Sequence, residues 1–355
     1  MRNERRWFAA LGLAIFFAGL ALPGAWFSYV QSLGPIDLAS QRDGSTIVVD
    51  RDGRLLRAFT MPDGRWRLPV RSGDVDPRYL AMLLAYEDHR FYDHGGVDWR
   101  AMARALFQMA TRGRIVSGGS TLTMQVARLI EPRQQRSLAA KLRQVARALD
   151  IESLVSKQGI IDRYLALAPF GGNIEGVRAA SLAYFGKEPR RLSIAEAALL
   201  VALPQSPEAR RPDRSPDAAR AARNRVIDRA VERGVISKAE GEAAKSEPVP
   251  REKKPFPMLA AHAAEEAAAA DPRAHVLRLS IDARLQEKLE MLARDSAERL
   301  GPKISVAIVA VDNKSGEIRA RVGAADYMSI ERGGAIDMTR APRSPGSALK
   351  PLIYA

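Results

Sequence analysis

The sequence predicts a mainly helical domain that follows a single membrane-spanning helix and precedes the start of a mixed α/β domain. Residues Trp7 to Phe27 form an almost uninterrupted apolar run, long enough as a helix to cross roughly 30 Å of hydrocarbon. Between about residues 76 and 246, apolar residues recur at helical spacing. After residue 276 the pattern changes to short strands and turns. With 355 residues, 46% of them apolar, the chain can bury more than one core.

The composition indicates an anionic partner other than nucleic acid. The formal net charge is +14, which suits nucleic acid, lipid headgroups or a phosphorylated substrate. Nucleic acid is disfavoured because the basic residues are spread along the chain and no Cys/His zinc spacing accompanies them. The chain has no cysteine, which excludes a disulfide framework and a thiolate zinc site. Its four histidines lack a metal-ligand spacing, so no protein-derived metal site is predicted.

The apolar run is interpreted as an uncleaved anchor. The short segment ahead of it carries more arginine than acidic residues, so it should stay cytoplasmic and the chain after about residue 30 should lie outside. A cleaved signal peptide is the alternative, since Pro23-Gly24-Ala25 offers small residues near the end of the run. The length of the run and the bulky Trp26 that follows favour the anchor. Residues 42–75 then look like a small hairpin that connects the anchor to the next domain.

Glu87 stands out in the first helix of the next domain. The helix opens at Asp76, and the apolar face that carries Leu80, Leu83 and Leu84 also carries Glu87. Because burying an unpaired charge is costly, Glu87 should point into a cleft or have a dedicated partner. The neighbouring Asp88 would raise the proton affinity of Glu87 further, which suits a general base. The alternative is a helix end that turns towards solvent.

Two segments after Glu87 suit an anionic surface or ligand. Arg100 to Gly113 is a basic amphipathic helix that can lie on an anionic bilayer, or else pack as an ordinary helix. Gly118 to Arg128 joins glycines to hydroxyls, an amide and a cation, a set that could hold a phosphate or sugar. A plain glycine turn with Ser120 as helix cap explains much of the second segment equally well.

The apolar pattern of the remaining sequence predicts further helices and strands, and with them the domain boundaries. Helices are predicted from Ser137 to Leu154, after Ser156, after Ser193 with a capping box at Glu196, and after Ser215. A stiff proline-rich stretch, an alanine-rich helix near 259–270 and strands within 276–280, 305–311 and 317–322 follow. We therefore expect an anchor (1–30), a connector (31–75), a helical domain (76–247), a linker with its helix (248–275) and the start of a second domain (276–355).

The motifs occur in this order: Glu87-Asp88-x-x-Phe91-x-x-His94-x-Gly96, Gly119-Ser120-Thr121-Leu122-Thr123-x-Gln125, Lys141 with its helix, Lys157 to Gly171, Leu192 to Gln205, and Ser347-x-x-Lys350. Over almost the whole chain they resemble the glycosyltransferase motifs and the transpeptidase nucleophile motif of bacterial class A penicillin-binding proteins. The resemblance implies a peptidoglycan glycosyltransferase with a lysozyme-like helical fold. This enzyme would polymerise lipid II at the periplasmic face of the bacterial inner membrane. Its implied partners are lipid II, the nascent glycan strand, the membrane and other cell-wall synthesis proteins.

The resemblance also assigns roles. Glu87 would deprotonate the acceptor sugar hydroxyl, which attacks the anomeric carbon of the growing chain with inversion and expels polyprenyl pyrophosphate. Cationic side chains, with Mg or Mn as an implied cofactor lacking an identified ligand set, would stabilise the pyrophosphate. The implied substrate-binding residues are Asp88, Phe91, His94, Arg114, Ser120, Thr121, Gln125, Arg128, Lys141 and Gln144. Ser347 and Lys350 would be the catalytic nucleophile and base of the transpeptidase half.

The chain departs from the family pattern at several positions. Gln144 stands where a second glutamate is usual, so cations are expected to carry more of the leaving-group stabilisation. Ala166 replaces an asparagine, and Met124 replaces the first of two glutamines. In the family the remaining transpeptidase elements lie beyond Ala355, so the α/β transpeptidase domain is expected to be incomplete here and inactive. Two other functions stay open: an inactive scaffold that binds the precursor, and glycan cleavage by a lytic transglycosylase or lysozyme-like enzyme.

Overall fold

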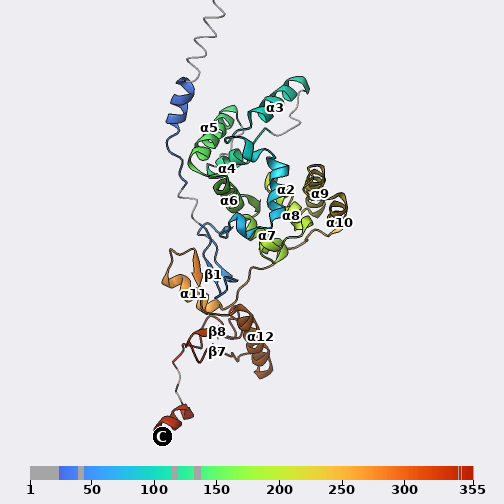
Figure 1. The fold of residues 1–355 in the computed structure, drawn as a ribbon. Helices are drawn as coiled ribbons and strands as arrows, with labels where there is room; N and C mark the ends of the chain where they lie inside the picture. Colours follow the sequence, from blue (N-terminus) through green and yellow to red (C-terminus); the bar gives the residue numbers. More distant parts are fainter. Residues whose placement is uncertain are drawn as a thin grey trace, which may run out of the picture. The chain divides into compact units, whose positions relative to one another are not determined.

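The computed structural model describes residues 24–38, 44–112, 119–131, 137–342, 344 and 346–354 (Figure 1). The predicted membrane span from Trp7 to Phe27 lies largely outside this range, and only a helical segment over residues 24–32 is described there. Within the described residues no helix combines the length and the apolar character that crossing a membrane requires. The chain forms two compact units, Met1–Arg42 with Arg90–Ile160, and Asp43–His89 with Ile161–Ala355.

The first unit is helical in its described part. Its helices are α3 (Trp99–Arg112), α4 (Leu122–Ile130) and α5 (Leu138–Leu154), together with the beginning of α6 (Lys157–Leu167). Helices α4 and α5 pack against each other around a core of Val97, Met124, Val145 and Ala148 (Figure 1). The helix predicted from Arg100 is α3, and it begins after Asp98, whose carboxylate accepts a hydrogen bond from the Ala101 amide at 2.8 Å.

Helix α4 begins one residue later than a Ser120 cap would require. Its N-cap is Thr121, whose Oγ1 accepts a hydrogen bond from the Met124 amide at 3.1 Å. The same hydroxyl donates to the Gly96 carbonyl at 2.6 Å, which ties the start of α4 to the preceding loop. Thr121 is buried and Ser120 is exposed, so the Ser120 cap proposed as an alternative is wrong.

In the second unit, one group of helices packs around α8 (Ile194–Ala202). They are α2 (Pro77–Glu87), α7 (Val177–Phe185), α9 (Pro216–Glu232) and α10 (Lys238–Ser246). The short 3-10 turns that precede or connect them are η2 (Ser72–Asp74), η4 (Pro189–Arg191) and η5 (Leu203–Gln205). The predicted capping box of Ser193 and Glu196 is present at the start of α8. Helix α2 buries Tyr79, Met82 and Leu83 against α8 and α9, whereas Leu80 and Leu84 are half-buried. The buried face of α2 is therefore shifted by about one residue from the apolar face that the sequence predicted.

A three-stranded sheet joins distant parts of the second unit. The predicted hairpin is formed by β1 (Ile47–Val49) and β2 (Leu55–Ala58), which pair antiparallel. Strand β6 (Val276–Arg278) pairs parallel with β1, with Ile47 opposite Val276. Side chains from β1, β2 and α11 (Ala261–Ala270) form a core on this sheet. Strand β6 was predicted, but its pairing with β1 was not.

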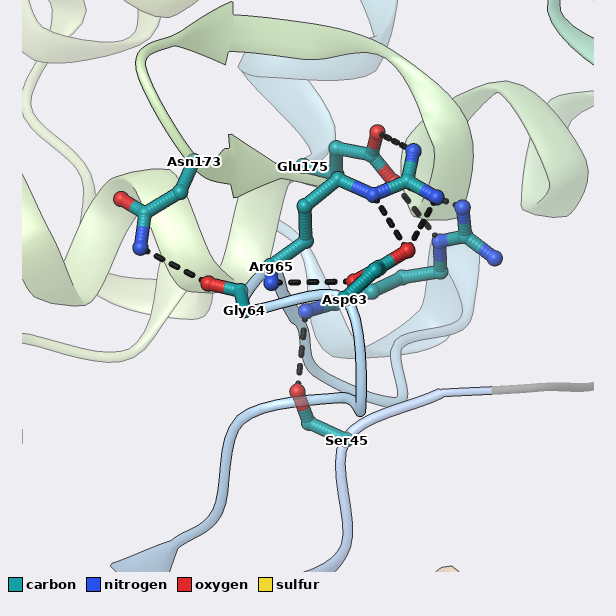
Figure 2. Close-up of polar contacts among 7 residues, drawn as sticks. Ser45, Asp63, Gly64, Arg65, Asn173 and Glu175 are labelled. Atoms are coloured by element: carbon teal, nitrogen blue, oxygen red, sulfur yellow. Dashed lines mark hydrogen bonds and ion pairs between the residues drawn. The ribbon is translucent and has the colours of Figure 1, made fainter.

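A second small sheet attaches the hairpin region to the helices of the same unit. Strand β3 (Trp66–Arg67) pairs parallel with β5 (Ile174–Glu175), which pairs with β4 (Pro169–Gly171). Figure 2 shows Arg65 between Asp63 and Glu175, and the amide of Asn173 donating to the Gly64 carbonyl at 2.9 Å. Arg67 also donates to Glu175, at 2.6 Å. Arg67 and Glu175 have low exposure, so their ion pair favours one geometry of this junction, whereas Arg65 and Asp63 are exposed.

The end of the chain is a mixed α/β segment. It contains α12 (Ala283–Leu300), the hairpin β7 (Ile308–Val311) and β8 (Ile318–Val322), the turn η6 (Gly346–Leu349) and α13 (Lys350–Tyr354). This agrees with the predicted change of pattern after residue 276, and the mainly helical character before it is confirmed. That the segment belongs to a transpeptidase domain stays a prediction, as do the predicted domain boundaries.

Candidate active site

Glu87 is the last residue of α2 and has a dedicated partner. The Gln205 amide, from η5, donates to Glu87 Oε1 at 2.8 Å, and Arg210 donates to Gln205 Oε1 at 3.1 Å. Arg210 thus fixes the orientation of the Gln205 amide, and the amide orients the carboxylate. Burial, and then the negative charge of Glu87, raise the pKa of Tyr79. Sequence reasoning missed Gln205 as this partner, although it closes the fifth motif.

Gly96 allows the loop of the first motif to lie close to α5 in the first unit. Its φ is +84°, and a Cβ built on it would lie 2.6 Å from the Ala148 carbonyl oxygen and 2.9 Å from Glu152 Cγ. Only glycine accommodates both the left-handed backbone and this close approach. Phe91, earlier in the same motif, is buried. The first motif therefore shapes the loop around its buried aromatic ring and its glycine.

Glu152 connects three of the predicted motifs. Its Oε1 accepts hydrogen bonds from Thr123 Oγ1 at 2.8 Å and from Lys157 Nζ at 2.7 Å. Lys157 Nζ also donates to the His94 carbonyl at 2.6 Å and lies 4.4 Å from the centre of the Phe91 ring. The Glu152 side chain is 12% exposed, so the charge is partly desolvated and needs these partners. No site role for Glu152 or Lys157 was predicted.

Lys141 and Ser120, both predicted as substrate-binding residues, are in contact. Lys141 Nζ donates to Ser120 Oγ at 2.5 Å. Burial, and then the positive charge of Arg128, lower the pKa of Lys141. Ser120 and Arg128 are exposed and Lys141 is half-buried. The first unit therefore presents a hydroxyl and two cations together, as the binding of a phosphate requires.

Gln144 lines a small hollow with Arg128 and Glu131. Glu131 accepts from Arg143 at 2.7 Å and pairs with the buried Arg147 at 2.8 Å. Burial alone would raise the pKa of Glu131, but the hydrogen bonds from these arginines outweigh it and lower that pKa. Glu131 is thus a carboxylate of the hollow that Gln144 lines, and two arginines pair with it.

The other predicted residues are placed as follows. Asp88 is buried at the C-cap of α2, and Gln125 is half-buried on α4. Ser347 and Lys350 are exposed, in η6 and at the start of α13. Arg114 lies outside the described residues. Glu87 and Asp88 belong to the second unit, and the predicted residues from Phe91 to Gln144 belong to the first.

The described side chains offer no ligand set for a metal. Within the ranges that the structure covers, no group of three or more His, Asp or Glu side chains could hold a metal ion. The residues described around Glu87 and Lys141 therefore do not fit a protein-held Mg or Mn. The implied cofactor stays a prediction, and no reaction step is derived through it.

Comparison with known proteins identifies the family. A family model described as transglycosylase matches residues 52–231, about half of the chain, and this region includes every predicted glycosyltransferase residue. The chain is 42% identical to penicillin-binding protein 1C of Escherichia coli over 99% of its own length and 45% of that protein. It is 32% identical to penicillin-binding protein 1A of Haemophilus influenzae over 74% of its own length and 29% of that protein.

The chain thus spans less than half the length of these relatives. Among solved structures, penicillin-binding protein 1A from Haemophilus influenzae overlaps 76% of this chain and 33% of its own at 20% identity, with a TM-score of 0.35 that supports no conclusion about the fold. The family match and the identities confirm the resemblance found in the motifs. The chain belongs to the transglycosylase family, in the group of the class A penicillin-binding proteins.

Proposed function

We propose that this chain is a peptidoglycan glycosyltransferase that polymerises lipid II into glycan strands by inverting transfer. The observation that carries the proposal is Glu87, which ends α2 and is oriented by Gln205 at 2.8 Å. A positioned carboxylate at the end of a helix suits a general base. Family membership and the cluster of Ser120, Arg128 and Lys141 give further support.

In the proposed reaction, Glu87 takes the proton of the acceptor sugar hydroxyl as its oxygen bonds to the anomeric carbon. The bond from that carbon to the polyprenyl pyrophosphate breaks, and the pyrophosphate keeps the electron pair. The departing group is already a stable anion, so it needs cations rather than a second acid. Lys141 and Arg128 supply two positive charges, and Ser120 supplies a hydroxyl that binds a phosphate oxygen.

We place the enzyme at the inner membrane, with a single-pass anchor, a cytoplasmic N-terminus and a lysozyme-like catalytic domain in the periplasm. Helix α3 supports this location, because it combines arginines with the exposed aromatic side chains of Trp99 and Phe107, 59% and 69% exposed. A basic helix with exposed aromatic residues suits the surface of an anionic bilayer. Lipid II would then reach the protein from that surface.

The test supplies the detergent-solubilised protein with labelled lipid II in one reaction and with finished glycan strands in another. Gel electrophoresis should show long polymer from the first and unchanged strands from the second. Shortened strands without polymer would indicate a lytic transglycosylase or hydrolase. Tight binding of lipid II without turnover would indicate a precursor-binding scaffold. Either of these results would refute the synthase proposal.

The proposed role of Lys141 predicts the alkaline limb of the pH profile. If the charged form is required, kcat falls as the pH rises through the lowered pKa of Lys141. A nearby cation disfavours the charged amine, so Arg128→Gln should raise that pKa and move the limb to higher pH. Arg225→Gln, at an exposed position on α9, is the control and should leave the limb in place. An unchanged limb in Arg128→Gln would contradict the role of Lys141.

The network around Glu152 predicts a loss of stability. Glu152→Gln removes the charge that Lys157 and Thr123 hydrogen-bond, which should lower the free energy of unfolding by about 2 kcal/mol. Asp217→Asn is the control, since that side chain is 86% exposed and its loss should change little. Urea titration of both variants measures the difference. Equal stabilities would mean that Glu152 does not hold the motifs together.

A further inference from the structure

A basic hollow of about 570 Å³ lies in the second unit, and no candidate active-site residue lines it. The β1–β2 turn, η2, the end of α7 and η4 line it, together with Pro257 of the linker. Leu55 and Leu182 are buried and provide an apolar surface within it. Its volume falls within the roughly 300–1,000 Å³ usual for small-molecule sites.

Part of the charge that lines the basic hollow is already neutralised. Arg178 donates to both carboxylate oxygens of Glu188, at 2.7 and 2.8 Å. Lys187 pairs with Glu196 at 2.6 Å. Asp74 accepts a backbone hydrogen bond at 2.9 Å and keeps its negative charge. The two ion pairs build the wall of the hollow rather than offering free charge.

The remaining charge of the basic hollow is mostly positive. Arg54, on the β1–β2 turn, and Arg191, in η4, make no side-chain hydrogen bond or ion pair within the part of the chain that the structure describes. Arg190 donates to the Gly73 carbonyl at 2.9 Å and keeps further guanidinium donors. Asp52 and Asp74 offset two of these charges. Three guanidinium groups therefore line the hollow against two carboxylates.

We propose that the basic hollow binds a small ligand with oxyanion groups, either carboxylates or phosphates. Guanidinium groups bind both kinds of oxyanion through paired N–H donors. Arg54 and Arg191 come from separate elements, so a ligand with two acidic groups would bridge the β1–β2 turn and η4. The apolar surface of Leu55 and Leu182 suits the carbon skeleton between such groups.

The test uses the full chain in detergent micelles with labelled leucine methyl groups. Citrate and pyrophosphate are titrated separately, and the methyl resonances of Leu55 and Leu182 report on the hollow itself, independently of catalytic activity. We expect these resonances to shift and to saturate with a Kd on the order of 1 mM or lower. The double variant Arg54→Gln/Arg191→Gln should raise that Kd at least about tenfold.

Arg225→Gln, exposed on α9 and outside the hollow, is the matched control and should bind as the unmodified chain does. Arg54 and Arg191 are both exposed, so their replacement should not disturb the core. Unchanged leucine resonances outside the basic hollow will verify that the double variant is folded. A response to citrate alone assigns a carboxylate ligand, and a response to pyrophosphate alone assigns a phosphate ligand. If neither anion shifts Leu55 and Leu182 at about 10 mM, or the double variant binds equally well, the proposal is wrong.

Discussion

Replacing Glu87 by glutamine is expected to reduce the rate of lipid II polymerisation by about 100-fold or more. Glutamine has nearly the same shape, and its amide oxygen still accepts the hydrogen bond from Gln205, so the end of α2 should keep its geometry. The amide cannot take the proton of the acceptor hydroxyl. The side chain is half-buried, so the melting temperature should stay nearly unchanged or rise.

The initial rate with labelled lipid II and the thermal midpoint are measured on the same preparation. Glu287→Gln, an exposed position on α12 in the same unit, is the control and should keep the full rate. If Glu87→Gln retains more than about a tenth of the rate, Glu87 is not the general base. A large drop in the thermal midpoint would instead attribute the lost activity to unfolding.

Replacing Gly96 by alanine is expected to lower the free energy of unfolding by about 3 kcal/mol, the largest stability effect predicted here. Alanine must adopt a φ near +84° and place its Cβ 2.6 Å from the Ala148 carbonyl oxygen. Relief of that contact requires the loop to move away from α5. The movement would also disturb the hydrogen bond from Thr121 to the Gly96 carbonyl.

The neighbouring glycine provides the control. A Cβ built on Gly95 meets no heavy atom within 4 Å, and Gly95 does not have a positive φ. Gly95→Ala should therefore change the free energy of unfolding by less than about 1 kcal/mol. Urea titration of the two variants makes the comparison. Similar stabilities would show that the loop yields easily and that Gly96 is not required for its close approach to α5.

Local signals in the sequence predicted the helices well. The caps at Asp76 and Ser193 are recognisable because the capping side chain bonds to backbone groups two or three residues further on. The same locality explains the error at Ser120, since Ser120 and Thr121 are both good caps. Only the contact of Thr121 with Gly96, 25 residues earlier, decides between them.

Contacts between distant residues were not predictable in this way. Gln205 lies 118 residues from Glu87, and no local pattern indicates that its amide orients the carboxylate. Glu152 resembles an ordinary helical surface residue until Thr123 and Lys157 are brought to it. The buried face of α2 also depends on where α8 and α9 pack, which a small difference in helix rotation changes.

The sheet that contains β1 and β6 has a consequence for the order of folding. Next to that pair, the Thr46 hydroxyl donates to the Ala274 carbonyl across 228 residues of sequence. During synthesis, the edge of β1 that pairs with β6 stays unpaired until residues 276–278 have emerged. The helices that lie between β1 and β6 in the sequence can already fold by then. An unpaired strand edge invites pairing with other chains. The slow step of folding, and the stage most exposed to aggregation, should therefore be the late arrival of β6 at this edge.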